Sequence, residues 1–160
     1  SRVFHIGPTP VFISGLTITN GSGNGAGILN EYAFLTVDGC TISGNNGEGI
    51  RNYDTFSSGS DQVENSILRV SNSTISGNSG WGIVNFGVGV SLELTVSNST
   101  ISGNGGGILN YGYDYTDATV VISNTTISGN PGQPAGGAFS TDAAASTPRR
   151  TPVPSWCCLP

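Results

Sequence analysis

The chain has no lysine and no methionine, and only 9% of its 160 residues are charged. Because its formal net charge is −5, it offers no basic surface of the kind that binds nucleic acid, and we expect no nucleic-acid partner. No apolar run approaches the roughly 18 residues that a membrane-spanning helix requires. The few cysteines, Cys40, Cys157 and Cys158, make no disulfide framework.

Repetition is what the sequence has in abundance. The motif Thr-Ile-Ser-Gly-Asn occurs at 41–45, 74–78, 100–104 and 126–130, with a relaxed copy at 17–20. A second motif, Gly-Ile-x-Asn, occurs at 27–30, 49–52, 82–85 and 107–110. The isoleucines of the first motif are Ile18, Ile42, Ile75, Ile101 and Ile127, separated by 24, 33, 26 and 26 residues. Periods of this length are typical of solenoids.

Each repeat alternates apolar and polar residues, as in Leu94-Thr95-Val96 and Thr100-Ile101-Ser102, which predicts strands. The Gly-Asn pairs that follow predict bends, because both residues tolerate positive φ. One repeat cannot bury its own apolar side, so successive copies must stack at about 4.8 Å. The sequence therefore predicts an all-β parallel β-helix of about five coils with three short strands per coil. The domain spans 1–130, with coils near 11–34, 35–67, 68–93 and 94–119 and a partial coil at 120–130.

Stacking places like residues in columns along the axis. The isoleucine column is expected to point inward and form the core, with the flanking Thr and Ser outward. Asparagines form two columns for which we expect structural hydrogen-bonded ladders: Asn45, Asn78, Asn104 and Asn130, and Asn30, Asn52, Asn85 and Asn110. An aromatic column, Tyr53, Phe86 and Tyr111, follows the second ladder and is interrupted by Glu31. We expect a packing stripe there; with Tyr113 these residues are also the candidates for a ligand surface.

Residues 131–160 differ from the rest in composition, because the repeat ends and proline and alanine dominate. Only 136–140 resembles the second motif, and proline lacks the donor that a ladder strand needs. We expect a disordered tail. Because the chain starts with Ser1 rather than Met, we also expect it to be a piece of a longer protein.

Catalytic chemistry has little to support it in the regular strands, whose outward positions are mostly Thr, Ser and Asn. Glycoside hydrolysis needs two carboxyls at a set separation, and His5 is interpreted as an end residue rather than a catalyst. We therefore favour a protein that is not an enzyme and has no cofactor.

A calcium site is an alternative to the absence of a cofactor. Acidic residues in two loops could bind one bridging calcium ion through their carboxylate oxygens. These candidates are Asp54, Asp61, Glu64, Asp114 and Asp117.

The motifs Gly-Gly-Ile-x-Asn at 106–110 and Ser-Thr-Ile-Ser-Gly-Asn resemble the repeats of bacterial polymorphic outer-membrane proteins. They are still more similar to repeats of large secreted proteins with a CSLREA-type domain, as is the opening at 1–6. The resemblance covers about residues 1–130. It implies a right-handed, pectate-lyase-like parallel β-helix, export, an extracellular or cell-surface location and an adhesin-like role.

The leading hypothesis is a non-catalytic fragment of a secreted or cell-surface β-helix protein, structural or adhesive, with glycans or other surface proteins as partners. The alternative is a carbohydrate-binding or carbohydrate-cleaving β-helix. A minor alternative is ice binding through the outward Thr and Ser columns. Unpaired strand edges at the first and last coils predict end-to-end self-association.

Overall fold

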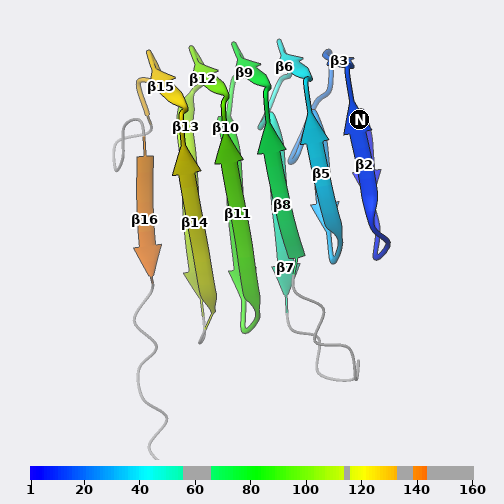
Figure 1. Cartoon of the computed structure of the whole chain (residues 1–160), viewed down its shortest axis with the longest axis vertical. Coiled ribbons are helices and arrows are strands. Elements are labelled where there is room, and N and C mark those ends of the chain that lie inside the picture. The colour runs from blue at the N-terminus through cyan, green and yellow to red at the C-terminus, as the bar shows by residue number, and fades with distance from the viewer. Residues whose placement is uncertain (56–65, 114–115, 133–138, 144–160) are drawn as a thin grey trace, which may run out of the picture.

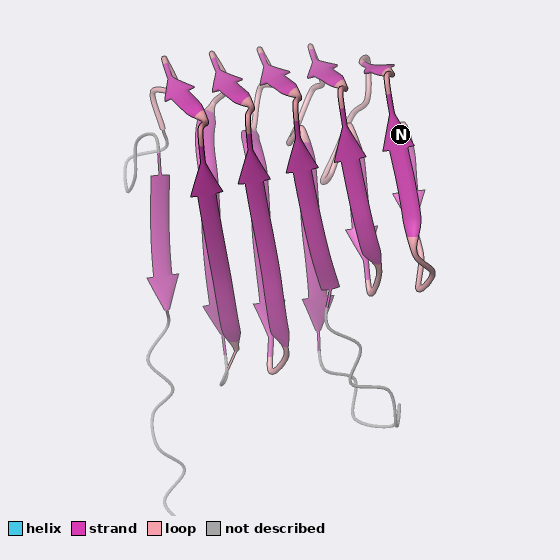
Figure 2. Ribbon diagram, viewed as in Figure 1, coloured by secondary structure: helices cyan, strands magenta, loops and turns pink. Residues whose placement is uncertain are grey.

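The computed structural model describes residues 1–55, 66–113, 116–132 and 139–143, and all its regular elements are strands in three parallel sheets (Figures 1 and 2). Sheet A contains β1 (Phe4–Ile6), β4 (Ile28–Glu31), β7 (Ile50–Thr55), β10 (Trp81–Val88), β13 (Gly106–Tyr113) and β16 (Phe139–Ala143). Sheet B contains β2 (Val11–Ser14), β5 (Phe34–Asp38), β8 (Ser66–Ser71), β11 (Ser91–Ser97) and β14 (Asp117–Ser123). Sheet C contains β3 (Thr17–Ile18), β6 (Thr41–Ser43), β9 (Thr74–Ser76), β12 (Thr100–Ser102) and β15 (Thr126–Ser128).

The chain visits the sheets in the order A, B, C and then returns to A one step further along the axis, as β4, β5, β6 and β7 do. Every strand pair is parallel, and Figure 1 shows the strands of sheets A and B running in opposite directions along facing layers. The predicted all-β parallel β-helix with three strands per coil is confirmed. Within the described residues there is no helix long and apolar enough to cross a membrane.

The isoleucine column lies in sheet C and points into the coil. Ile42 pairs in register with Ile75, and Ile75 with Ile101, and all three side chains are fully buried. Ile18 is buried at the first strand of the sheet, whereas Ile127 is only half-buried because β15 is the last. Each fully buried isoleucine contributes about 1.5–3 kcal/mol, so the stack itself supplies the core that one repeat lacks.

In the four Thr-Ile-Ser-Gly-Asn copies, the bend after the sheet C strand uses the glycine and not the asparagine of the Gly-Asn pair. Gly44, Gly77, Gly103 and Gly129 have φ values of 63–65°. The asparagine that follows is buried and serves through its amide. Positive φ at asparagine occurs at the corner between sheets B and C, at Asn72, Asn98 and Asn124, and in the relaxed copy after β3, at Asn20. A bend thus follows each of these strands, as the Gly-Asn pairs predict, with the glycine adopting the positive φ.

A hydroxyl ladder lines that B–C corner. The Ser73 hydroxyl accepts a hydrogen bond from the Cys40 N–H at 3.1 Å and donates to the Ser71 carbonyl at 2.7 Å. Ser99 repeats the arrangement one coil later, with its hydroxyl accepting from the Ser73 N–H. Cys40 is buried, and its thiol lies 3.4 Å from the Asp38 carbonyl, where the three later coils have a hydroxyl donor. Cys40 is thus a structural residue of this corner.

One more strand follows residue 130. β16 extends sheet A, with Phe139 aligned to Ile108 and Ala143 to Gly112. The segment that resembles the second motif, 136–140, overlaps this strand in sequence at 139–140. The loop expected to carry Asp61 and Glu64 lies outside the described residues from 56 to 65, as do 133–138 and 144–160 of the expected disordered tail.

Candidate functional site: the outer face of sheet A

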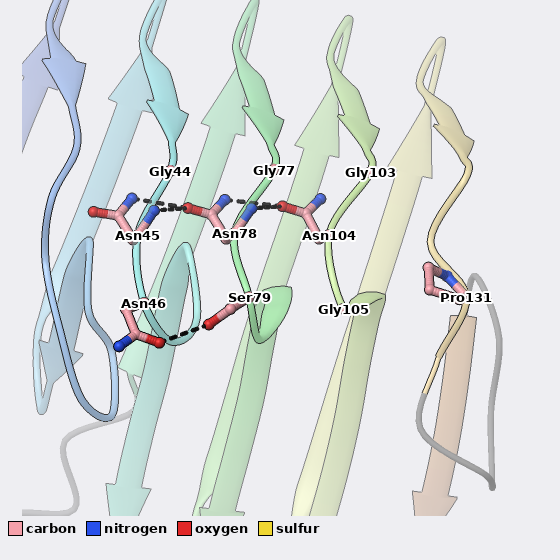
Figure 3. A pocket seen from close by; sticks show the side chains of 10 residues that line it. All are labelled: Gly44, Asn45, Asn46, Gly77, Asn78, Ser79, Gly103, Asn104, Gly105 and Pro131. Carbon is pink, nitrogen blue, oxygen red and sulfur yellow. Dashed lines mark hydrogen bonds between the residues drawn. The ribbon is translucent and has the colours of Figure 1, made fainter.

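The first asparagine column is a continuous ladder inside the corner between sheets C and A (Figure 3). Asn45 Nδ2 donates to Asn78 Oδ1 at 2.8 Å, Asn78 Nδ2 to Asn104 Oδ1 at 2.9 Å, and Asn104 Nδ2 to Asn130 Oδ1 at 3.1 Å. Each amide nitrogen also donates to an isoleucine carbonyl of the preceding coil, as Asn78 does to Ile42. At the N-terminal end, Asn45 Oδ1 accepts from the Gly21 N–H.

The second column runs inside sheet A. Asn30 donates to Asn52, Asn52 to Asn85, and Asn85 to Asn110, each at 2.7 Å. The predicted asparagine ladders are thus confirmed. Their amides bond along the axis and to bend carbonyls, so they hold the coils in register. Among the described residues, one buried side-chain oxygen has no partner, Asn30 Oδ1 at the N-terminal end of this ladder.

The predicted aromatic column, which we now call the aromatic file, lies on the outer face of sheet A. It consists of Tyr53 in β7, Phe86 in β10 and Tyr111 in β13. Tyr53 aligns with Phe86, and Phe86 with Tyr111. Their ring centroids are 5.6 and 5.5 Å apart and each pair is within 5° of parallel. All three rings are half-buried, and Tyr113 further along β13 is 47% exposed. The rings pack on one another and still present part of their surface to solvent.

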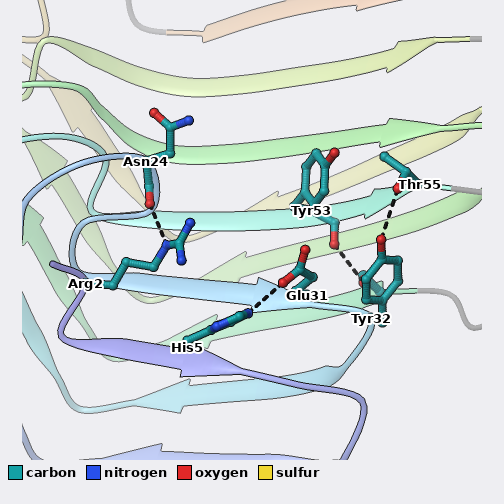
Figure 4. Close-up of polar contacts among 8 residues, drawn as sticks. Arg2, His5, Asn24, Glu31, Tyr32, Tyr53 and Thr55 are labelled. Carbon is teal, nitrogen blue, oxygen red and sulfur yellow. Dashed lines mark hydrogen bonds and ion pairs between the residues drawn. The ribbon is translucent and has the colours of Figure 1, made fainter.

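Two ion pairs adjoin the file. Arg51 Nη1 lies 2.9 Å from Glu48 Oε1, and its guanidinium carbon is 5.5 Å from the Tyr53 ring centroid and 5.7 Å from that of Phe86. These distances are within cation–π range. His5 Nε2 lies 2.6 Å from Glu31 Oε2, and Glu31 aligns with Tyr53 in register (Figure 4). We call His5, Glu31, Glu48, Arg51, the aromatic file and Tyr113 the sheet A face.

The charged part of this face was missed by the sequence analysis. The sequence alone led us to interpret His5 as an end residue and Glu31 only as an interruption of the aromatic column, and neither Arg51 nor Glu48 was singled out. The coil step would have revealed the His5–Glu31 pair, because His5 aligns with Leu29, two residues before Glu31. The Arg51–Glu48 pair depends on how the strand enters sheet A, which the repeat does not specify.

The described residues form one uninterrupted solenoid, and a family model for the right-handed β-helix region matches residues 4–127. The chain belongs to the right-handed β-helix family. No curated protein and no solved structure gives a match. Family membership establishes the fold and its handedness, and leaves the activity to be argued from the site.

Two of the five calcium candidates, Asp54 and Asp117, lie within the described residues. Asp54 points into the coil, is 1% exposed and accepts a hydrogen bond from the Ser66 N–H at 3.0 Å. Its carboxylate therefore holds the backbone at the start of β8 and is not presented to solvent. Asp117 is exposed at the start of β14, in another sheet. Asp61, Glu64 and Asp114 lie outside the described residues, and among those described no three His, Cys, Asp or Glu side chains gather to hold a metal.

A shallow groove of about 530 Å³ runs along the corner between sheets C and A (Figure 3). Its floor is the glycine column at Gly44, Gly77 and Gly103, where missing side chains leave the backbone open. Asn46 and Ser79 bond to each other at 3.1 Å along one side. The groove has neither a charged nor an aromatic side chain in its lining. Of the two surfaces, the sheet A face has the chemistry for binding.

Proposed function

We propose that this chain is a rigid, non-catalytic segment of a secreted or cell-surface β-helix protein, and that it makes adhesive contacts through the sheet A face. The scaffold supports this proposal, because two internal ladders fix the spacing of the coils. A side chain presented by one coil therefore has a set distance from its equivalent on the next. Such a scaffold suits presentation of a contact surface.

The observation that carries the proposal is the concentration of three stacked rings and two ion pairs on one outer face. Aromatic side chains and arginine are enriched at binding interfaces. The aromatic rings give large contact areas for little loss of conformational freedom. By contrast, the outward columns of sheet C consist of Thr and Ser, as at Thr74 and Ser76. Contact energy is therefore expected at sheet A rather than at sheet C.

Carbohydrate cleavage is supported less well. It would draw on the loop carboxylates, and Asp54 is removed from that set because it is turned inward. The two carboxylates on the sheet A face, Glu31 and Glu48, are each held by a basic partner. That arrangement suits hydrogen bonding to a ligand and gives no specific support to a reaction.

Export and a location outside the cell are part of this proposal. They rest on the likeness of the Gly-Gly-Ile-x-Asn and Ser-Thr-Ile-Ser-Gly-Asn motifs to the repeats of CSLREA-type and polymorphic outer-membrane proteins. A surface-exposed solenoid that presents a contact face is consistent with an adhesin-like role and with glycans or other surface proteins as partners.

A printed panel of glycans, collagen, fibronectin and mucin tests the proposal with labelled full-length chain. We expect binding to at least one component, and its loss in the double variant Phe86→Ala/Tyr111→Ala. The matched control is Phe12→Ala, which removes a 66% exposed ring from sheet B and should bind as the unchanged chain does. Thermal melts establish that each variant is folded. Absence of binding, or binding that the double variant retains, contradicts the proposal.

A further inference from the structure

We propose that the C-terminal segment, residues 147–156, docks in an extended conformation along a groove on the outer face of sheet B of its own chain. The segment lies outside the described residues, and its sequence is Thr-Pro-Arg-Arg-Thr-Pro-Val-Pro-Ser-Trp. Because the groove is on another sheet, this proposal is independent of the adhesive role of the sheet A face. It is supported by the shape of the groove, its chemistry, the spacing of that chemistry and the reach of the chain.

The groove consists of two hollows that share Ile67, near the starts of the sheet B strands. The first has a volume of about 410 Å³, and its lining includes Pro8, Pro10, Tyr32, Phe34 and Ile67. The second has a volume of about 210 Å³, and its lining includes Ile67, Glu93, Asp117, Thr119 and Val121. In register, Phe34 aligns with Ile67, and Ile67 with Glu93. The groove therefore crosses the strands and follows the coil axis.

The two ends of the groove differ in chemistry. The end nearest the N-terminus presents prolines and the rings of Tyr32 and Phe34. The opposite end carries two carboxylates, those of Glu93 and Asp117. Glu93 Oε1 lies 3.2 Å from Arg69 Nη2, and the Glu93 side chain is still 42% exposed. A ligand that fits both ends needs cationic groups at one and an extended apolar segment at the other.

The C-terminal segment has these two parts in the required order. Arg149 and Arg150 are followed by Pro152-Val153-Pro154. The three other arginines of the chain each contact an acceptor within the described residues. Proline restricts φ and removes the backbone donor, which favours polyproline II over a further ladder strand. Proline-rich segments in this conformation bind grooves lined by aromatic side chains, because little conformational freedom is lost on binding.

The spacing of the segment matches that of the groove. Glu93 and Phe34 are two coils apart, which corresponds to about 10 Å at the strand spacing of a sheet. Val153 comes three residues after Arg150, which corresponds to about 9 Å in polyproline II. With the arginines at the carboxylates, the apolar residues therefore meet the aromatic rings. Trp156, three residues further along, then reaches the prolines at the end of the groove.

Strand β16 brings the start of the segment within reach of the groove. It ends at Ala143, one coil beyond Gly112, and Figure 1 shows this end on the side of the molecule where β14 and β11 begin. From this coil to that of Phe34 is four steps, or about 19 Å. The residues from Ala143 to Pro154 span about 34 Å in polyproline II. The chain is therefore long enough to turn back along the axis and fill its own groove.

Acrylamide quenching of Trp156 fluorescence in the full-length chain tests the proposal. Trp81→Phe leaves Trp156 as the only tryptophan, and thermal melts establish that this background is folded. We expect blue-shifted emission and a lower quenching constant than in urea. Phe34→Ala removes a ring from the groove and should shift the emission to the red and raise quenching. The matched control is Phe12→Ala, which removes a 66% exposed ring of the same sheet outside the groove and should change neither.

A charge exchange tests the pairing of the arginines with the acidic end. Asp117 is exposed, so the fold should tolerate Asp117→Arg, and this change should release Trp156. Arg150→Asp should release it as well. The two changes combined in one chain should restore much of the protection, because opposite charges face each other again.

The outcomes decide between this chain and other occupants of the groove. Quenching in the Trp81→Phe background that equals the value in urea would overturn the proposal. So would protection that Phe34→Ala leaves unaltered, or that the combined charge variant fails to recover. Protection that appears only as the protein concentration rises would assign the groove to the segment of a second copy and overturn docking within one chain. Each of these results leaves the adhesive role of the sheet A face unaffected.

Discussion

Asn104 Oδ1 accepts two hydrogen bonds from Asn78, one from its side-chain Nδ2 at 2.9 Å and one from its backbone N–H at 3.1 Å. The same double contact joins Asn45 to Asn78. One amide oxygen thus fixes both the side chain and the backbone of the preceding coil. This links the corner of each coil to the next and explains why the Gly-Asn pair recurs with the isoleucine core.

Asn78→Ala is expected to be among the most destabilising polar substitutions in the chain. It leaves the Asn45 and Asn104 amides and the Ile42 carbonyl short of partners, and each buried unsatisfied group costs about 1–3 kcal/mol. We expect a loss of about 3–5 kcal/mol in the free energy of unfolding, measured by urea titration with circular dichroism. Asn130→Ala, at the less enclosed end of the ladder, should lose about 1–2 kcal/mol because water can reach the freed groups. Equal losses would contradict the ladder as the cause.

Because Asn30 Oδ1 has no hydrogen-bond partner among the described residues, we expect Ile6→Asn to lower the stability of the fold less than a buried Ile→Asn substitution normally does. Ile6 aligns with Asn30 just as Asn30 aligns with Asn52, so Ile6→Asn would place an amide donor where the second ladder stops. The new hydrogen bond should offset much of the lost apolar burial. Ile28→Asn, at a fully buried position of the neighbouring column, gains no such bond and should cost about 3 kcal/mol more. Chemical denaturation of both variants compares them, and similar losses would show that the ladder cannot be extended.

The fold could be predicted because it is specified by what recurs. The isoleucine column, the alternation around it and the two asparagine columns each appear several times, so a local error in one copy is corrected by the others. Alternation extended by a few residues would also have placed Asp54. It shares the inward parity of Asn52 in β7, so its side chain is buried in the coil.

The candidate site could be predicted only in part, because its charged residues occur once each. Tyr53, Phe86 and Tyr111 repeat and so appeared as a column. Glu48 pairs with Arg51 within one coil, and His5 pairs with Glu31 across a step of 26 residues. A single occurrence has no second copy to mark it as meaningful. Such pairs are set by register and side-chain reach, which become visible in the structure.

Acid should destabilise the chain partly through Asp38. Hydrogen bonds from the Ser71 hydroxyl at 2.6 Å and the Asn72 amide at 2.7 Å lower the pKa of the Asp38 carboxyl in the folded state. A lowered folded pKa gives stability that is present above the unfolded value of about 3.9 and is lost as pH falls through the folded value. Asp38→Asn should therefore show a shallower loss of melting temperature on acidification.

Ser71→Ala provides the matched test of that cause. Of the two hydrogen bonds that lower the Asp38 pKa, the one from Ser71 has the larger effect, and this substitution removes it. An NMR titration should therefore find the Asp38 pKa closer to its ordinary value. Asp117→Asn, which removes an exposed carboxylate from β14, serves as the control and should retain the acid sensitivity due to Asp38. An Asp38 pKa that Ser71→Ala leaves unchanged would assign the shift to another contact.

The last strands of sheets B and C predict head-to-tail association of the isolated chain. Within the described residues, no strand pairs with the outer edge of β14 or β15, and Ile122 is 37% exposed, whereas its equivalent Val96 is fully buried. Unpaired strand edges recruit other strands, and β2 of a second copy is a parallel strand of matching pattern. We expect light scattering to show a mass that rises with concentration.

A pair of lysine variants tests whether this edge is responsible. Val121→Lys places a charge on the edge strand and should reduce the rise in mass. Thr95→Lys, at the aligned position of central β11, should not reduce it. A constant monomer mass, or equal effects of the two lysines, would exclude association through this edge.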